Sequence, residues 1–406
     1  MNNAPTAAIA RVAGFRAAGV TCGLKKSGRP DLALILADSP CSAAALFTTN
    51  AVKAAPVLYD MQLLQRTRGL RAVLINAGNA NAVTGAQGMV DAARMAALTE
   101  TACQLPADSV FVMSTGIIGE KMPMDRVKRG ISAAAQAINS AAGEIGQYAA
   151  EAIMTTDTVP KQAYAETTLG GATVRVGGMA KGSGMIHVNM ATMLAVVVTD
   201  AAIEPALLDT ALRQVAAVTF NRVTVDGDTS TNDTLLLLAS GQAKNSPIVA
   251  GSAGYNAFVA ALTDVCTQLS KAIARDGEGA TKLVEITVTG AATEAEADRA
   301  AKTVATSPLV KTAIFGADPN WGRILMAVGR SGVTLSPEKI SLWLGDALLV
   351  RQGEPQPFDA AAVSAWLSAA DEVPVRVSLG LGSGEATVWT CDFSYKYVEI
   401  NAEYHT

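Results

Sequence analysis

Two periodicities alternate along the chain, one typical of helices and the other of buried strands. Apolar residues three or four apart, with many alanines, predict helices, and short continuous apolar runs predict strands covered on both faces. The predicted helices are residues 91–103, Asp125–Ile138, Ala141–Ile153, a segment from Pro205 through Val215, Tyr255–Ala274, and a short helix begun by the capping pair Thr293 and Glu296. The predicted strands are Ala72–Ile75, Val110–Met113, Leu194–Thr199, Thr234–Leu238, Val284–Val288 and Val375–Ser378.

The order of these elements predicts a layered α/β fold. Alanine-rich helices alternate with apolar strands over roughly the first two thirds of the chain, which indicates one body in which helices cover sheets. Strand, capped helix and strand then begin again, so we expect a smaller α/β lobe over approximately residues 280–406. No low-complexity linker or fixed-period repeat separates the two parts.

Composition excludes several classes of protein. Half of the 406 residues are hydrophobic and 17% are charged, which is too apolar for a disordered chain. The 32 Lys and Arg against 36 Asp and Glu give a net charge of −4 without a long basic run, so nucleic acid is not the expected partner. Apolar stretches fall far short of the about 20 residues that span a membrane. Arg11 and Arg16 interrupt the N-terminal segment where a signal peptide would need an unbroken apolar run. We therefore expect a cytoplasmic protein that does not bind a membrane.

Histidine and cysteine are too few or too scattered for several kinds of active site. The only histidines, His187 and His405, exclude a His-rich metal site and leave few bases for a Ser-His-Asp relay. The five cysteines form no C-x-x-C pair, as expected of reduced, buried thiols. Five clustered polar residues lack the spacing of a calcium loop, so we expect turn and hydrogen-bond roles for them and predict no catalytic metal. They are Asn79, Asn81, Asp226, Asp228 and Asp233.

Two glycine-rich segments resemble phosphate loops only in composition. Residues 380–384 join two alternating runs, which predicts the turn of a β-hairpin, since no helix follows to hold a phosphate. Residues 177–184 place Lys181 before a glycine, whereas a P-loop places it after one. Four glycines in eight residues still indicate a sharply turning backbone, in which Lys181 is either an anion contact or a surface lysine.

The segment after this second loop suits an N-terminal nucleophile made by self-cleavage. Thr192 follows Ala191 and precedes the apolar strand that begins at Leu194. If the peptide bond between Ala191 and Thr192 is cut, the threonine hydroxyl can attack while the freed α-amine takes its proton. An α-amine has a pKa of about 7.7–8.0, so it can act as a base near neutral pH without histidine.

Eight segments in one order make the chain resemble a single enzyme family over nearly its whole length. The segments are GGMAKGSGMIHVNMATMLAVVVTD (177–200), INAGNANAVTG (75–85), MSTGIIGE (113–120), MTTDT (154–158), TFNRVTVDGDTSTND (219–233), DGEGATKL (276–283), FGADPNWGR (315–323) and NAEYHT (401–406). The first of them, around Thr192, closely resembles the cleavage region of the ornithine acetyltransferases, also called glutamate N-acetyltransferases or bifunctional arginine-biosynthesis proteins.

The resemblance implies an activity and a mature form. It implies an αββα sandwich with a smaller lobe, and acetyl transfer from N-acetylornithine to glutamate in arginine biosynthesis. Cleavage between Ala191 and Thr192 would give an α chain of residues 1–191 and a β chain of residues 192–406, assembled as two of each. No cofactor is expected. Some family members also take acetyl from acetyl-CoA, and the residues leave open whether this chain does.

The resemblance also implies roles for individual residues. Thr192 would be the nucleophile of both cleavage and transfer, through an acetyl-threonine ester. Thr115 and Gly116 match the oxyanion hole, where donors face the developing negative oxygen. The positions that match the substrate site are Thr155, Lys181, Thr192, Glu278, Asn401 and Thr406, with Thr156 as the neighbouring alternative to Thr155. Lys181 suits a substrate carboxylate, and Glu278 suits an ammonium group.

Two other functions use the same residues differently. A self-processing amidohydrolase or aminopeptidase would share the nucleophile but pass the acyl group to water. A non-catalytic amino-acid-binding or structural protein would leave the chain uncut. His187 lies five residues before the expected cut, and we expect it to pack or hydrogen-bond near the loop, because the new amine already provides a base.

Overall fold

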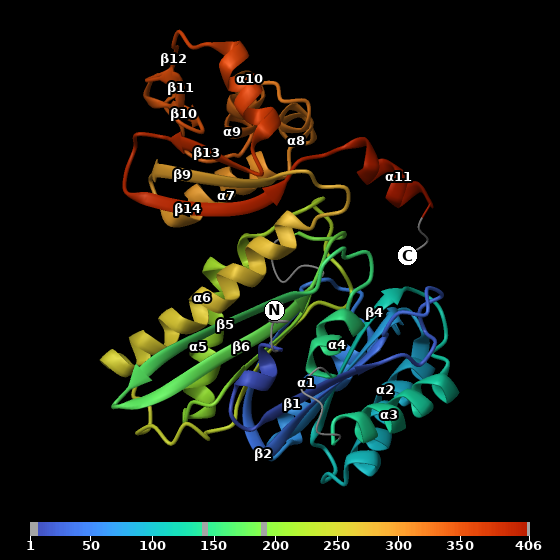
Figure 1. The fold of residues 1–406 in the computed structure, drawn as a ribbon. Coiled ribbons are helices and arrows are strands. Elements are labelled where there is room, and N and C mark those ends of the chain that lie inside the picture. The colour runs from blue at the N-terminus through green and yellow to red at the C-terminus, as the bar shows by residue number, and fades with distance from the viewer. Residues whose placement is uncertain (1–6, 140–144, 188–192, 404–406) are drawn as a thin grey trace, which may run out of the picture.

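The computed structural model describes residues 7–139, 145–187 and 193–403, and these form two bodies, each built on a sheet (Figure 1). The elements of the larger body are β1 (Phe15–Val20), β2 (Leu32–Phe47), α1 (Ala55–Arg66), β3 (Leu70–Asn79), α2 (Gly85–Cys103), β4 (Val110–Ile117), α3 (Met124–Ala137), α4 (Ile145–Ala152), β5 (Lys161–Leu169), β6 (Ala172–Lys181), β7 (Leu194–Thr199), α5 (Pro205–Val218), β8 (Thr234–Ala239) and α6 (Ala253–Arg275). The elements of the smaller body are β9 (Leu283–Ala291), α7 (Glu294–Ala305), α8 (Pro308–Phe315), α9 (Trp321–Gly329), β10 (Ser341–Leu344), β11 (Ala347–Arg351), β12 (Glu354–Pro355), α10 (Ala360–Ala369), β13 (Glu372–Ser378) and β14 (Gly384–Cys391), followed by α11 (Tyr395–Glu403).

Strand β2 connects the two halves of the larger sheet, whose order is β4-β3-β2-β8-β7-β6-β5 with β1 also beside β2. Its residues 32–37 pair with β1, its residues 32–36 pair with β3, and its residues 42–47 pair with β8. The register shifts between Leu36 and Cys41, a stretch that contains Pro40, and proline disrupts a regular strand ladder. One long strand therefore pairs with strands of both halves of the sheet, on either side of this shift.

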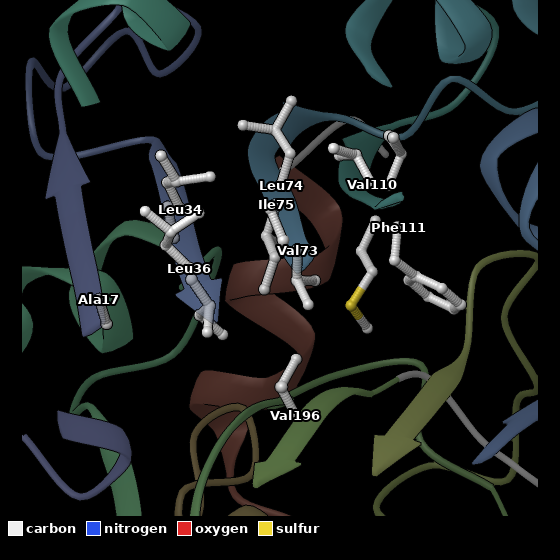
Figure 2. Packing of buried hydrophobic residues seen from close by; sticks show 14 of the residues in the cluster. Ala17, Leu34, Leu36, Val73, Leu74, Ile75, Val110, Phe111 and Val196 are labelled. Atoms are coloured by element: carbon white, nitrogen blue, oxygen red, sulfur yellow. The ribbon is translucent and has the colours of Figure 1, made fainter. Parts of the chain in front are cut away.

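The two halves of the sheet face each other across an apolar interior. Leu36, Val73 and Val196, from β2, β3 and β7, belong to one buried cluster, as Figure 2 shows. Residues of α1, α2 and α3 complete that cluster. Next along β7, Val197 points away into a second buried cluster formed with α5 and α6, because successive side chains of a strand face opposite sides. The layers are therefore helix, sheet, sheet and helix, which confirms the predicted αββα sandwich.

The smaller body has its own sheet and its own core. Its strand order is β12-β11-β10-β13-β9-β14, and α7, α8 and α9 pack against it around a separate apolar cluster. The hairpin predicted around residues 380–384 is wrong, because β13 and β14 do not pair with each other. Both pair with β9, which lies between them, and the backbone of Leu381 and Gly382 donates to the Gly290 carbonyl as the link crosses the end of β9. Alternation locates strands but does not identify their partners.

The remaining sequence predictions are largely confirmed within the described residues. Each predicted strand lies inside β3, β4, β7, β8, β9 or β13, and α2, α3, α5, α6 and α7 lie where helices are expected. The hydroxyl of Thr293 accepts from the Glu296 amide and so caps α7. Helix α4 matches the later part of the expected Ala141–Ile153 helix, whose residues 141–144 lie outside the described residues.

Helix α6 packs against β5 and β6 and forms the outer helical layer of its half (Figure 1). It is the one helix of the described ranges that is long and apolar enough to cross a membrane. Half of its most apolar window is buried inside the protein, and Phe258, Leu262 and Leu269 are in the core. These are the properties of a core helix.

Candidate functional site

The predicted site residues that the structure describes lie around a single cavity of about 310 Å³. These residues come from five separate parts of the chain. They are Thr115, Gly116, Thr155, Thr156, Lys181, Glu278 and Asn401. Ala191, Thr192 and Thr406 lie outside the described residues. The cavity lies where β4, β6, the start of the smaller body and α11 meet, so residues far apart in sequence share one space.

The end of β4 forms one wall of the cavity. Gly116 has φ +132°, and a Cβ there would lie 2.3 Å from the Gly78 carbonyl carbon of the neighbouring strand β3. Only glycine fits this close approach. The adjacent Ser114 carbonyl accepts from the Asn232 amide at 2.8 Å, which fixes the strand end against the loop before β8. The backbone that carries Thr115 and Gly116 is thus held rigidly at the cavity wall.

Lys181 ends β6 with its ammonium group inside the cavity wall. Its side chain is buried, and its one hydrogen bond among the described residues is a long one, 3.4 Å from Nζ to the Thr115 hydroxyl. Burial lowers the pKa of Lys181 although the nearby carboxylates of Asp157, Asp233 and Glu278 act to raise it. A buried cation without a close anionic partner is costly. A substrate carboxylate in the cavity would supply that partner.

A buried network of one lysine and two aspartates holds the backbone at two cavity residues, Thr155 and Lys181. Lys161 Nζ lies 2.7 Å from Asp157 and 2.5 Å from Asp276, and the three side chains are 1%, 0% and 6% exposed. Asp157 also accepts from the amides of Thr155 at 2.9 Å and Gly182 at 2.7 Å. Burial acts to raise the pKa of Asp157, but the charges of Lys181 and Lys161 outweigh burial and lower it.

Sequence reasoning missed this network. Asp157 and Asp276 lie inside the MTTDT and DGEGATKL segments, but Lys161 lies outside both, and nothing in the spacing pairs residues more than a hundred positions apart. Only the fold shows that these three side chains meet and are buried, so the sequence offered no signal for the network. The network fixes Thr155 on one side and the loop after Lys181 on the other.

Glu278 is an acidic residue of the cavity wall. Its carboxylate accepts from the Asn401 side-chain amide at 2.8 Å, and this bond ties α11 to the cavity. Its own amide donates to the Ser183 carbonyl at 3.0 Å. Gly184 faces the carboxylate, since a Cβ on Gly184 would lie 2.3–2.5 Å from its atoms. Glu278 therefore has a fixed position that depends on a glycine in the 177–184 loop.

Asp226, which also lines the cavity, anchors the two residues that follow the 177–184 loop. Its carboxylate accepts from the amides of Met185 at 2.6 Å and Ile186 at 2.8 Å. Burial raises the pKa of Asp226 to about 6 although these hydrogen bonds act to lower it. The negative charge of Asp226 therefore depends on pH in the range where enzymes are usually assayed.

The other singled-out polar residues have hydrogen-bond contacts inside the fold. Asn79 donates to the carbonyls of Glu120 and Lys121, and Asn81 donates to Gly88. His187 Nδ1 lies 3.1 Å from the Thr224 hydroxyl, burial lowers its pKa, and it does not line the cavity. Over the described ranges, no group of three or more His, Cys, Asp or Glu side chains could hold a metal ion.

Asp233 lies next to the chain segment that follows Thr192. It is 1% exposed, its Oδ1 accepts from the Met193 amide at 3.1 Å, and its Oδ2 has no partner within the described part of the chain. Burial raises the pKa of Asp233 well above its usual range, and the hydrogen bonds from Met193, Thr48 and Ser230 only partly oppose this shift. The buried carboxyl group of Asp233 therefore lies beside Met193, directly before the first residue of β7.

Comparison with known proteins gives one consistent result. Residues 16–406 match the model of the ArgJ family. The arginine biosynthesis bifunctional protein ArgJ of Symbiobacterium thermophilum is 53% identical over 97% of both chains. The protein of that name from Geobacter sulfurreducens is 49% identical over 97% of this chain and all of its own.

A solved structure is similar as well. The crystal structure of the arginine biosynthesis bifunctional protein ArgJ of Bacillus halodurans is 47% identical and covers 50% of this chain and 96% of its own, with a TM-score of 0.50. The family match spans almost the entire sequence, and both relatives match over nearly their full length. This chain belongs to the ArgJ family.

Proposed function

We propose that the protein is a glutamate N-acetyltransferase that moves an acetyl group from N-acetylornithine to glutamate in arginine biosynthesis. The observation that carries this proposal is the charge arrangement of the cavity, in which a buried Lys181 and a buried Glu278 line one small space. A cation and an anion at fixed positions suit an amino acid, which presents a carboxylate and an ammonium group. Membership of the ArgJ family supports the same reaction.

The proposed nucleophile is Thr192. Strand β7 begins at Leu194, which pairs with Lys181 across the strands, so the chain enters the cavity-lining layer two residues after Thr192. The threonine hydroxyl attacks the acetyl carbonyl of N-acetylornithine and forms an ester as the amide C–N bond breaks. The proton lost by the hydroxyl leaves with ornithine as its amine. In this proposal Thr115 and Gly116, which line the cavity at the end of β4, stabilise the oxyanion.

The second half of the reaction reverses the first with a different amine. The glutamate amine attacks the acetyl ester, the ester C–O bond breaks, and the new amide is N-acetylglutamate. The proton from the amine returns to the threonine oxygen. In this scheme no cofactor is needed, because both bonds are exchanged through the hydroxyl and the α-amine of one residue.

We further propose self-cleavage between Ala191 and Thr192. The α chain would then hold residues 1–191 and the β chain residues 192–406, with assembly into two of each. The matching Bacillus halodurans chain is about half as long as this one, which supports a mature form made of shorter chains. Since β6 and β7 pair on either side of the cut, the cut is not a domain boundary. We also propose that the enzyme works in the cytoplasm, which fits relatives named for a biosynthetic role.

Thr192→Ala tests the nucleophile in both roles. We expect a single band of full-length mass in denaturing electrophoresis and no transferase activity, against two bands for the wild type. Two bands from the variant would contradict the assignment.

The alternative function is a hydrolase with the same nucleophile, and one assay separates the two. Wild-type enzyme is incubated with N-acetylornithine with and without glutamate, and ornithine release is followed. A transferase requires glutamate for sustained release. Deacetylation at the same rate without glutamate would favour the amidohydrolase.

A further inference from the structure

The base proposed for acetyl transfer does not yet exist when the chain first folds. It is the α-amine of Thr192, and before the cut this nitrogen is part of the peptide bond to Ala191. The lone pair of a peptide nitrogen is delocalised into the carbonyl, so the nitrogen does not act as a base. During cleavage the attacking hydroxyl must therefore give its proton to another group, and a proton must reach the nitrogen that leaves. A separate acid–base side chain beside the cut would meet both needs.

Asp233 holds the backbone directly after the proposed nucleophile. Its Oδ1 accepts from the Met193 amide at 3.1 Å, and Met193 follows Thr192 in the chain. Bond lengths and angles keep successive backbone nitrogens roughly 3–4 Å apart in any conformation. Thr192 itself lies outside the described residues, but the Asp233 carboxyl group is hydrogen-bonded to the backbone nitrogen one residue after the one that must receive a proton.

The position of this carboxyl group is fixed by residues that adjoin three strands of the larger sheet. Met193, just before β7, is held at both polar backbone groups, since its amide donates to Asp233 and its carbonyl accepts from the Thr234 amide at 3.1 Å. The Asp233 carbonyl accepts from the amide of Thr48, just after β2, at 2.9 Å. A fixed position suits proton transfer, because donor and acceptor must come within hydrogen-bond reach.

The second oxygen of this carboxyl group is free for a reacting proton. Oδ2 of Asp233 is buried and has no hydrogen-bond partner among residues 7–139, 145–187 and 193–403, and the whole residue is 1% exposed. Buried polar atoms are normally paired, so an orphaned carboxyl oxygen beside the cut calls for a function. Burial also raises the pKa of Asp233, although the charge of Lys181 acts to lower it, and a raised pKa makes the carboxylate a stronger base.

Two other titratable side chains of this region are already engaged elsewhere. His187 Nδ1 lies 3.1 Å from the Thr224 hydroxyl, and the ring does not line the cavity of the proposed active site. Lys181 Nζ lies 3.4 Å from the Thr115 hydroxyl and serves in the proposed function as the partner of a substrate carboxylate. Asp233 has no role in the proposed transfer reaction.

We infer that Asp233 is the acid–base group of self-cleavage, which takes the proton of the Thr192 hydroxyl and delivers it to the Thr192 nitrogen. This inference rests on the proposed function, because it concerns the step that prepares the nucleophile. As the proton moves, the bond from the threonine oxygen to the Ala191 carbonyl carbon forms and the C–N bond between the two residues breaks. Water then hydrolyses this ester. Ala191 leaves as a carboxylate, and of the two protons of water one stays on the threonine hydroxyl and one goes to solvent.

The test follows the rate at which full-length chains are cut. Chains are made in a timed cell-free translation, and denaturing electrophoresis measures the uncut fraction. Asp233→Asn keeps an oxygen that can accept from the Met193 amide but removes the acid–base group, so cleavage should slow roughly a hundredfold or more. Asp60→Asn is the matched control, since Asp60 on α1 is also 1% exposed, accepts from the Val112 amide at 3.0 Å and has a pKa raised by burial. The control should be cut as fast as the wild type.

Three further measurements separate proton transfer from a structural role. The uncut Asp233→Asn chain should melt at the same temperature as uncut Thr192→Ala. Hydroxylamine, which cleaves esters but not peptide bonds, should release no fragments from it, because the ester never forms. Asp233→Glu and Asp233→Gln have equal size and differ in the acid, so the Glu variant should be cut faster.

Four results would overturn the inference while the proposed function stands. They are cleavage of Asp233→Asn at the wild-type rate, equally slow cleavage of Asp60→Asn, release of fragments by hydroxylamine, and equal rates for the Glu and Gln variants. A wild-type chain that stays uncut would instead refute the self-cleavage in the proposed function.

Discussion

Lys161→Met should destabilise the protein strongly because it leaves two buried carboxylates without their shared cation. The substitution keeps most of the side-chain volume but removes the ammonium group that lies 2.7 Å from Asp157 and 2.5 Å from Asp276. Removing one partner of a buried ion pair costs about 3–5 kcal/mol. At about 2–4 °C per kcal/mol, the melting temperature should fall by roughly 6–20 °C.

The size of this effect should depend on pH in a definite direction. In the wild type the pKa of Asp157 is lowered, so its charge stabilises the fold above the ordinary carboxyl pKa of about 3.9, and that contribution is lost only as the pH falls into strong acid. Without Lys161, burial acts on Asp157 with less opposition and its pKa rises. The variant therefore keeps the Asp157 proton to a higher pH than the wild type does, so the gap in melting temperature should widen as the pH rises from the lowered pKa of the wild type toward that of the variant.

Scanning calorimetry of both proteins at several pH values measures this gap. Arg213→Met is the control, since Arg213 pairs with Asp209 in an exposed i,i+4 contact on α5 that is worth at most about 1 kcal/mol. A melting temperature close to that of the wild type would refute the assigned role of Lys161. A gap that stays constant or narrows with rising pH would refute the electrostatic explanation.

Three further predictions concern the cavity itself. Gly184→Ala should push the Glu278 carboxylate away and break its 2.8 Å bond to Asn401, so the KM for amino-acid substrates should rise roughly tenfold or more, whereas an unchanged KM would show that Glu278 tolerates the shift. Lys181→Ala should lower kcat/KM with N-acetylornithine at least about tenfold by removing the proposed carboxylate partner, and unchanged kinetics would exclude Lys181 from the site. Because the pKa of Asp226 is raised to about 6, its protonated form adds stability that is lost as the pH rises from about 4 to 6. Asp226→Asn should flatten that part of the melting curve against pH, and a persistent slope would assign it to another group.

The strands of the fold could be predicted from the sequence more completely than their partners. A continuous apolar run such as Leu194–Thr199 identifies a strand, because a strand buried on both faces needs apolar residues throughout. Strand β2 was not predicted, since Asp38 to Pro40 interrupt its pattern where the strand passes between the two halves of the sheet. The pairing of β13 and β14 with β9 depends on tertiary packing, which a local alternation does not encode.

The site was predictable where residues lie inside a family segment. Thr115, Lys181 and Glu278 come from three such segments, and the structure places all three around one cavity. The supporting lysine, Lys161, carries no local signal, because its importance comes from two aspartates that only the fold brings together. The cations that line a neighbouring cavity of about 670 Å³ were also missed, since Lys26 and Lys121 are nearly a hundred residues apart and form no run in the sequence.

The strand order has a consequence for how the proposed two-chain enzyme can be made. In the order β2-β8-β7-β6, two strands that follow the proposed cut lie between two that precede it. Each piece alone would expose unpaired strand edges along β2 and β6 or along β7 and β8, and such edges promote aggregation. With the proposed cut, the enzyme would be a natural split protein, whose two halves should each fail to fold when produced separately and should complement each other when produced together.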